Sequence, residues 1–144
     1  MPITKGFRAL VDEANACITT YSVDEVKARL GADPRLQLVD IRDPRELERE
    51  GTVPGAMHAP RGMLEFWVDP ASPYYKPAFG DENREYVLFC GAGWRSALAA
   101  KTLYDMGMRN VAHIDGGFSA WVKAEAPVES YEAHRARSAA RKGG

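Results

Sequence analysis

The stretch from Val87 to Ser96 constrains the fold of this chain more than any other. Residues 86–89 are apolar and rich in β-branched or aromatic side chains, which is typical of a strand buried on both faces of a parallel sheet. From Ser96 onward, apolar residues recur at helical spacing, and Gly107 stands where a C-terminal cap belongs. Cys90 therefore lies between the carboxyl end of a strand and the amino end of a helix.

This position favours a negatively charged sulfur. The first turn of a helix leaves backbone N–H groups unpaired and carries the positive end of the helix dipole. Gly91 and Gly93 allow the loop to curl so that several N–H groups point inward, and Arg95 adds a permanent positive charge. We therefore expect the Cys90 thiol to ionise below the usual range of a free cysteine.

Three motifs together resemble the rhodanese sulfurtransferases. The first is Cys90, followed after four residues by Arg95 and Ser96. The second is Val-Asp-Ile-Arg-Asp-Pro at residues 39–44, with Glu46 and then Val-Pro-Gly-Ala at 53–56, and the third is Asp-Gly-Gly-Phe-Ser-Ala-Trp at 115–121. The resemblance implies a rhodanese-like α/β domain over residues 22–128, with a central, mostly parallel sheet and helices on both faces.

The candidate site residues follow from the loop and from this resemblance. Cys90 is the expected catalytic residue. Asp40, Arg42 and Glu46 are expected to form a hydrogen-bonded ion network that supports the loop, with direct contact to the substrate as the alternative. Arg61 is either a solvated surface arginine or a second cation for an anionic donor. The expected substrate-binding residues are Gly91, Ala92, Gly93, Trp94, Arg95, Ser96 and Arg61.

The resemblance implies a sulfur transfer. Cys90 would take a sulfane sulfur from thiosulfate or a related small anionic donor, hold it as a persulfide, and pass it to cyanide, a thiol or a protein acceptor. A thiolate that is already ionised needs no general base, and the loop contains no histidine. We expect no cofactor, and no cluster of His, Cys, Asp or Glu has the spacing of metal ligands.

Two other functions stay open. A cysteine phosphatase or arsenate reductase also uses a cysteine, an anion-binding loop and an arginine at a helix start. The phosphatases that share the rhodanese fold, however, have one residue more in the loop than the four between Cys90 and Arg95. A non-catalytic binding module is the other alternative, although this chain retains the cysteine. Gly91 and Trp94 depart from the common family pattern, which leaves the choice of donor and acceptor open.

The chain divides into an extension, the domain and a tail. Apolar residues at helical spacing predict a helix over 7–16 in an N-terminal extension of residues 1–21. Cys17, at its end, is expected to be a small buried hydrophobe or, alternatively, a resolving thiol for Cys90. The tail of residues 129–144 is expected to be a frayed helix or disordered and mobile. From Ser130 onward its charge is +3, from one acidic and four basic residues: Glu132 against Arg135, Arg137, Arg141 and Lys142.

Capping and turn signals predict the elements between the extension and the tail. Ser22 with Glu25, and Asp43 with Pro44, predict the starts of helices over 23–30 and 44–50. Strands are predicted over 36–41, 56–59, 86–89 and 111–114, and residues 60–80, which hold four prolines, are predicted to be an ordered loop. His58 and His113 lie in or beside these strands and are expected to be structural. Trp121 is expected in the core.

Charge and hydropathy exclude several classes. With 19 basic and 20 acidic residues, the net charge of −1 gives no sign of nucleic-acid or anionic-membrane binding. No apolar run is long enough to cross a membrane, and the first residues lack the hydrophobic core of a secretory signal. We expect a cytoplasmic protein, whose two cysteines do not form a disulfide framework.

Overall fold

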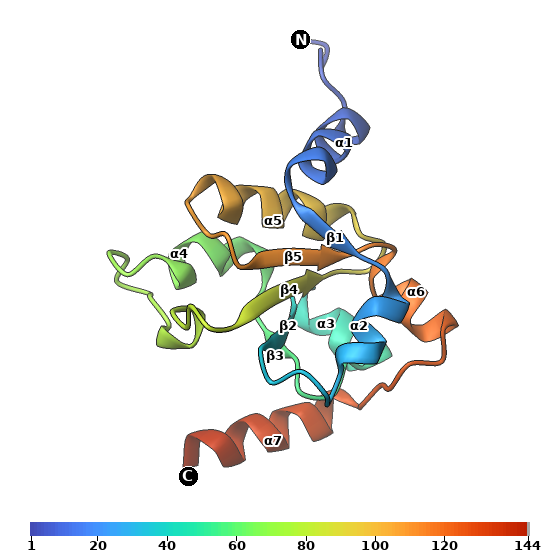
Figure 1. Cartoon of the computed structure of the whole chain (residues 1–144), viewed down its shortest axis with the longest axis vertical. Helices are drawn as coiled ribbons and strands as arrows, with labels where there is room; N and C mark the ends of the chain where they lie inside the picture. The colour runs from blue at the N-terminus through green and yellow to red at the C-terminus, as the bar shows by residue number, and fades with distance from the viewer. Residues whose placement is uncertain (144) are drawn as a thin grey trace.

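Parallel strands form the centre of the molecule (Figure 1). The computed structural model describes residues 1–143, and the side chains of residues 1–139. Its five-stranded, all-parallel sheet has the order β1-β5-β4-β2-β3. The strands are β1 (Thr19–Tyr21), β2 (Leu36–Asp40), β3 (Met57–His58), β4 (Glu85–Phe89) and β5 (Val111–Ile114).

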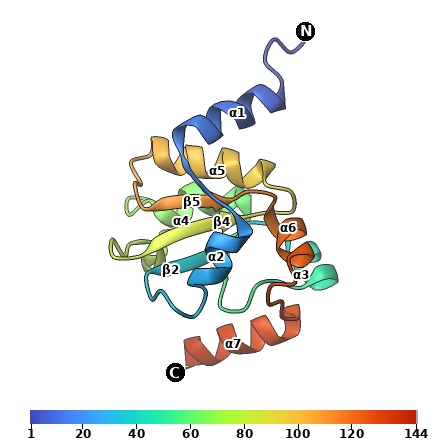
Figure 2. The ribbon, with the colours of Figure 1, turned by 45° about the vertical axis from the view of Figure 1, so that its right-hand side comes forward.

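Helices cover both faces of the sheet, as Figures 1 and 2 show. Side chains of α4 and α5 pack on one face, and side chains of α2 and α6 pack on the other. The α-helices are α1 (Phe7–Cys17), α2 (Val23–Arg29), α3 (Pro44–Glu50), α4 (Leu64–Val68), α5 (Trp94–Asp105), α6 (Gly117–Lys123) and α7 (Tyr131–Gly143). Two short 3-10 helices are η1 (Arg61–Met63) and η2 (Pro77–Phe79). The predicted fold class is confirmed.

Alternation along β4 separates the two halves of the core. Tyr86 and Leu88 belong to the cluster beneath α4 and α5, whereas Val87 and Phe89 belong to the cluster beneath α2 and α6, because successive strand residues point to opposite faces. Leu88 pairs with Val39 of β2 and with His113 of β5 in the sheet register. The carboxyl ends of β2, β4 and β5 therefore meet at one edge, and the chain after β4 emerges at that edge.

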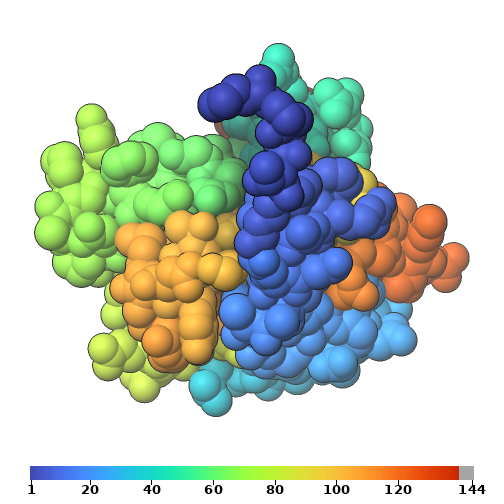
Figure 3. Space-filling view, turned by 90° about the horizontal axis from the view of Figure 1, so that it is seen from above, coloured from blue at the N-terminus to red at the C-terminus, as the bar shows by residue number. Residues whose placement is uncertain are grey.

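Both ends of the chain add a helix to the domain. The N-terminal helix α1 buries Val11 and Ala14 against Ala97 of α5, and Figure 3 shows it lying across the molecule beside α5. The C-terminal helix α7 packs against α3, following an antiparallel bridge between Thr52 and Glu129. The tail is thus helical from Tyr131 to Gly143. The side chains of Arg141 and Lys142, and the whole of Gly144, lie outside the described residues.

Three sequence predictions are wrong or incomplete. Strand β1 was not predicted, because three residues carry little periodicity and their partner strand β5 is remote in sequence. The predicted loop of residues 60–80 contains α4, which Pro60 and Pro70 flank without interrupting. Cys17 is exposed, because α1 packs on a single helix and buries only Val11 and Ala14.

Trp121 is buried, as predicted, and its indole N–H donates to the carbonyl of Pro127. In the part of the chain that the structure describes, no helix combines the length and the apolar character needed to cross a membrane.

Candidate active site

The loop after β4 directs two backbone N–H groups at the sulfur of Cys90. Sγ lies 3.2 Å from the amide nitrogen of Gly93 and 3.4 Å from that of Ser96, and both donate to it. Gly93 adopts a left-handed conformation with φ of 98°, which permits the tight turn into α5. The inward direction of these N–H groups agrees with the sequence prediction for the loop.

The start of α6 supports the loop from the other side. The amides of Phe118 and Ser119 donate to the carbonyls of Cys90 and Gly91, at 2.7 and 3.0 Å. A β-carbon at Gly117 would overlap the carbonyl oxygen of Cys90, so only glycine allows this close approach. The Gly-Gly motif at residues 116–117 therefore shapes the cysteine loop, although it lies more than twenty residues downstream.

The sulfur is enclosed. Cys90 is 1% exposed, and Ser96 is completely buried beside it. The rim of the loop is more open, because Ala92 is exposed and Trp94 is 47% exposed. Solvent therefore has almost no direct contact with the Cys90 side chain.

Arg95 lies at the rim and is held by α3. Its guanidinium donates to both carboxylate oxygens of Glu46, at 2.9 and 3.0 Å. Hydrogen bonding to Glu46 raises the pKa of Arg95, with a further contribution from Cys90, and hydrogen bonding from Arg95 lowers the pKa of Glu46. Glu46 also accepts from the amide of Asp43 in the capping box of α3. This pair ties the start of α3 to the start of α5.

Asp40 and Arg42 form a separate, fully buried pair. Arg42 donates to both carboxylate oxygens of Asp40, at 3.0 and 2.9 Å, and to the carbonyl of Gly51 at 2.8 Å. Thr52 also donates to Asp40, and the Arg42 guanidinium lies 4.1 Å from the ring centroid of Phe118. We call Asp40, Arg42 and Thr52 the Arg42 cluster. The predicted network thus divides, with Glu46 on Arg95 and Asp40 on Arg42.

Arg61 lies on η1, directly after β3. Its backbone amide donates to the carbonyl of Ile41, and its guanidinium donates to Glu65 at 2.8 Å and to Thr102 of α5 at 3.5 Å. The side chain is 32% exposed. A role in binding the donor stays a prediction for this residue.

Trp94 and Phe7 form an aromatic patch beside the loop. The centroid of the Trp94 ring lies 4.8 Å from the centroid of the Phe7 ring, and the guanidinium of Arg8 lies over both rings. Phe7 is 50% exposed. The first turn of α1 therefore reaches the rim of the cysteine loop.

The structure adds two residues, His113 and Asn15, that sequence reasoning did not place in the site. The hydroxyl of Ser96 lies 3.6 Å from Sγ of Cys90 and 2.9 Å from Nδ1 of His113, and Nε2 of His113 lies 2.8 Å from Oδ1 of Asn15. Burial lowers the pKa of His113 to about 4. The only sequence signal was a histidine in a predicted strand, and nothing in the sequence pointed to Asn15 on α1.

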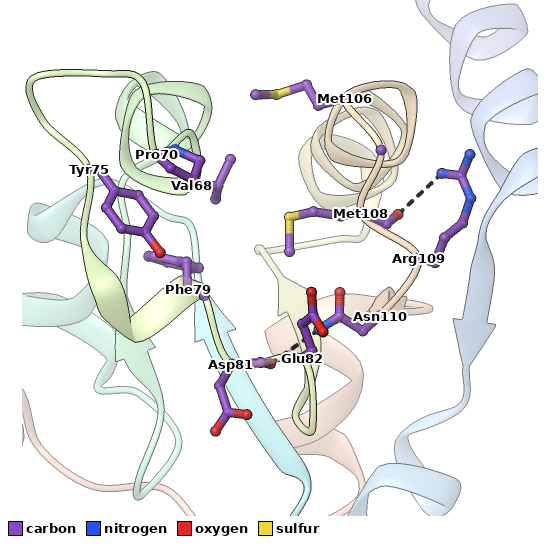
Figure 4. A pocket seen from close by; sticks show the side chains of 12 residues that line it. Val68, Pro70, Tyr75, Phe79, Asp81, Glu82, Met106, Met108, Arg109 and Asn110 are labelled. Carbon is purple, nitrogen blue, oxygen red and sulfur yellow. Dashed lines mark hydrogen bonds between the residues drawn. The ribbon is translucent and has the colours of Figure 1, made fainter.

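A pocket at the opposite edge of the sheet is separate from this site. It has a volume of about 570 Å³ and lies between residues 68–82 and residues 106–110 (Figure 4). These segments precede β4 and β5, whereas Cys90 follows β4. Among the described residues, no group of three His, Cys, Asp or Glu side chains could hold a metal ion.

The fold and the site together define a class of protein. A parallel α/β sheet presents a cysteine inside a loop of N–H donors at a helix start, an arrangement that binds anions at a nucleophilic sulfur. The sequence matches the Rhodanese-like domain over residues 22–124, and the chain belongs to this family. The resemblance found in the motifs is confirmed.

Several relatives show how far the similarity extends. The chain is 31% identical over 104 residues to "Putative sulfurtransferase YtwF" of Bacillus subtilis, which covers 72% of this chain and 90% of that protein. It is 27% identical over 109 residues to a "Sulfurtransferase" of Allochromatium vinosum, with 76% and 92% covered.

Two solved structures are also similar. A Rhodopseudomonas palustris protein of unknown function, described as "Possible Tyrosine Phosphatase", is 50% identical with a TM-score of 0.86, and the match covers 90% of this chain and 98% of that one. The "Polysulfide-sulfur Transferase Homodimer" of Wolinella succinogenes is 29% identical with a TM-score of 0.66, with 86% and 87% covered.

Proposed function

We propose that this chain transfers a sulfane sulfur from thiosulfate or a related anionic donor to a thiophilic acceptor through a persulfide on Cys90. The observation that carries the proposal is the pair of N–H groups of Gly93 and Ser96 directed at Sγ, in a loop with four residues between Cys90 and Arg95. Family membership and relatives named as sulfurtransferases support sulfurtransferase activity in general.

The first half of the reaction forms the persulfide. The Cys90 thiolate attacks the outer sulfur of thiosulfate, the sulfur–sulfur bond of the donor breaks, and sulfite leaves with the electron pair of that bond. N–H groups of the loop stabilise the negative charge that then lies on the outer sulfur of the persulfide. Arg95 at the rim supplies positive charge for the anionic donor and for the leaving sulfite.

The enclosure of Cys90 favours a donor with a projecting terminal atom. Thiosulfate and other sulfane donors present one sulfur beyond the rest of the molecule, so this atom can pass the narrow loop and contact Sγ. The phosphorus of a phosphoester is surrounded by four oxygens and must approach the sulfur with all of them. A residue that is 1% exposed inside a short loop suits the first geometry better.

A second nucleophile completes the cycle. Cyanide, a small thiol or a protein thiol attacks the outer sulfur of the persulfide and leaves Cys90 as the thiolate, so the kinetics are ping-pong. The exposed aromatic side chains of Trp94 and Phe7 beside the loop offer a surface for an acceptor larger than cyanide. A reducing compartment such as the cytoplasm would keep Cys90 and Cys17 as thiols between cycles.

Mass spectrometry tests the proposal directly. Incubation with thiosulfate and no acceptor should add the mass of one sulfur atom to the intact protein, and peptide mapping should place it on Cys90. Cys90→Ser should add no sulfur and should lose cyanide-dependent turnover by at least about a thousandfold. Cys17→Ser is the matched control and should retain most of the activity, because Cys17 is exposed at the end of α1. Equal losses in the two variants would instead make Cys17 a resolving thiol.

Phosphoester hydrolysis is the alternative to measure beside sulfur transfer, given the description of the Rhodopseudomonas palustris protein. Turnover of thiosulfate with cyanide and of an aryl phosphate should be compared on one preparation. We expect sulfur transfer and no phosphatase activity that depends on Cys90. Phosphatase activity that is lost in Cys90→Ser, without persulfide formation in the parent protein, would overturn the proposal.

A further inference from the structure

A chain of four polar side chains leads from the enclosed sulfur to the N-terminal helix. It runs from Cys90 to Ser96 at the start of α5, then to His113 on β5 and to Asn15 on α1, with contacts of 3.6, 2.9 and 2.8 Å. We call these residues the Cys90 chain. His113 is 1% exposed, whereas Asn15 is exposed and lies outside the part of the chain that matches the family.

The direction of each hydrogen bond follows from the chemistry of the end groups. Oδ1 of Asn15 only accepts, so Nε2 of His113 carries the hydrogen. A buried, neutral imidazole then has a bare Nδ1, which only accepts, and Ser96 must donate its hydroxyl hydrogen to it. The Ser96 oxygen is left to face Cys90 with its lone pairs, and it can accept the hydrogen of a thiol.

We propose that His113 fixes the direction of the Ser96 hydroxyl so that its oxygen accepts from Cys90, which favours the thiol over the thiolate. The inference rests on the proposed role of Cys90 as the nucleophile. His113 acts through Ser96 and is a positioning residue. The cysteine therefore experiences two opposed influences: the amides of Gly93 and Ser96 stabilise its thiolate, while the hydroxyl of Ser96 stabilises its thiol.

Ionisation of Cys90 breaks the S–H bond, leaves the electron pair on sulfur and releases the proton to solvent. Ser96 can then donate to the thiolate only by withdrawing its hydrogen from His113, which leaves Nδ1 without a donor unless His113 itself takes up a proton. The charged groups that act on the chain are Arg95 on Cys90 and Asp115 on His113. The two helices packed against His113 present it with neutral side chains, Ser96 from α5 and Asn15 from α1.

The ultraviolet absorbance of the thiolate, measured against pH, tests this inference. The experiment uses a Cys17→Ser background, in which Cys90 is the only cysteine. His113→Leu removes the acceptor and frees the Ser96 hydroxyl to donate to the sulfur. We expect the ionisation midpoint of Cys90 to fall by about one pH unit, the shift that one hydrogen bond to a charged group supports.

Two further variants keep the test sharp. His113→Asn is the matched control, because its amide oxygen takes the place of Nδ1 and keeps accepting from Ser96, so the midpoint should stay within about 0.3 unit of the parent value. Asn15→Ala changes only an exposed residue. Loss of its acceptor allows His113 to carry its hydrogen on Nδ1 and to donate to Ser96, so the midpoint should fall, by less than in His113→Leu.

The inference would be overturned if the ionisation midpoint of Cys90 were unchanged or raised in Asn15→Ala and also, where that protein folds, in His113→Leu. Persulfide formation from thiosulfate, measured on the same proteins, separates it from the proposed function. Lowered midpoints without a persulfide would leave the Cys90 chain in place and refute sulfur transfer. A persulfide together with unchanged midpoints would support sulfur transfer and refute the role proposed for the Cys90 chain.

Discussion

The two faces of the sheet carry polar groups of different character near the carboxyl ends of the strands. On the α4 and α5 face, the Cys90 chain joins the sulfur of Cys90 to a hydroxyl, to an imidazole whose pKa is lowered by burial, and to an amide. On the α2 and α6 face, the Arg42 cluster joins a carboxylate and a guanidinium that are both completely buried. Phe118 touches both regions, since its amide donates to Cys90 and its ring lies under Arg42.

The difference between the charged Arg42 cluster and the Cys90 chain shows how one edge of the sheet combines a rigid frame with a reactive group. A buried ion pair with two parallel hydrogen bonds cannot lose one charge without leaving the other unpaired, so it is suited to a fixed frame. Through its hydrogen bonds to Asp40 and to the carbonyl of Gly51, Arg42 joins the end of β2 to the chain after α3. Neutral groups can exchange the direction of their hydrogen bonds at a small cost, so they are suited to adjusting a sulfur.

The largest effect on stability is expected in the Arg42 cluster. Asp40→Asn keeps the shape of the side chain but leaves the buried Arg42 charge with only the half-exposed carboxylate of Glu50, 3.6 Å away, which costs about 3–5 kcal/mol of unfolding free energy. Urea denaturation measures this change. Ionisation of Cys90 in the folded fraction should stay within about 0.3 pH unit of the parent protein, because the Cys90 chain lies on the other face.

Asp43→Asn is the matched control for this variant. Asp43 also accepts two hydrogen bonds from an arginine, Arg45, but both side chains are exposed, at 44% and 79%. Asparagine also caps helices well, so α3 keeps its first turn. The urea midpoint should stay close to that of the parent protein. Similar losses in Asp40→Asn and Asp43→Asn would show that burial does not distinguish the two pairs.

His113 is expected to make stability depend on pH. Its pKa is lowered by burial to about 4 in the folded protein, whereas an unfolded histidine titrates near 6.5. As the pH falls through 6.5, the unfolded state binds the proton first, so stability is lost between pH 6.5 and 4 and is fully present above that range. The parent protein should lose about 2 kcal/mol between pH 7 and 5 from this residue.

The comparison with His113→Asn isolates this contribution. Asparagine does not titrate, while His134, whose pKa is also lowered by burial, is present in both proteins and cancels in the difference. The loss on going from pH 7 to 5 should therefore be smaller in His113→Asn than in the parent protein. Parallel pH profiles would mean that His113 binds its proton equally well in the folded and unfolded states, so that burial does not lower its pKa.

The sequence predicts local features of this molecule well because their causes are local. The change from strand to helical spacing around Cys90 placed the loop, and the capping residues Ser22 and Asp43 placed the starts of α2 and α3. The inward N–H groups at the sulfur follow from glycine positions next to a helix start. Each of these depends on residues less than about one helical turn apart.

Features that depend on packing between remote segments were not predictable. His113 meets Ser96 only because β5 lies beside β4 beneath α5, and Asn15 reaches His113 across 98 residues of sequence. Glu46 was grouped with Asp40 and Arg42 by sequence proximity, but α3 carries it to Arg95. Neither strand alternation nor helical spacing records which elements become neighbours.

Phe118→Leu tests whether the two regions are energetically separate, and it is expected to have the smallest effect. The change removes the ring beneath Arg42 while the backbone N–H still donates to Cys90, so stability should fall by about 1–2 kcal/mol and persulfide formation should change less than about threefold. Phe66→Leu is the matched control, since Phe66 is 50% exposed and pairs only edge-on with Tyr74. The Phe118 ring lies against Arg42 and stacks on Phe89, whereas its backbone N–H donates to the carbonyl of Cys90. A large loss of persulfide without a loss of stability would show that the ring itself positions Cys90, and the two faces could no longer be treated as independent.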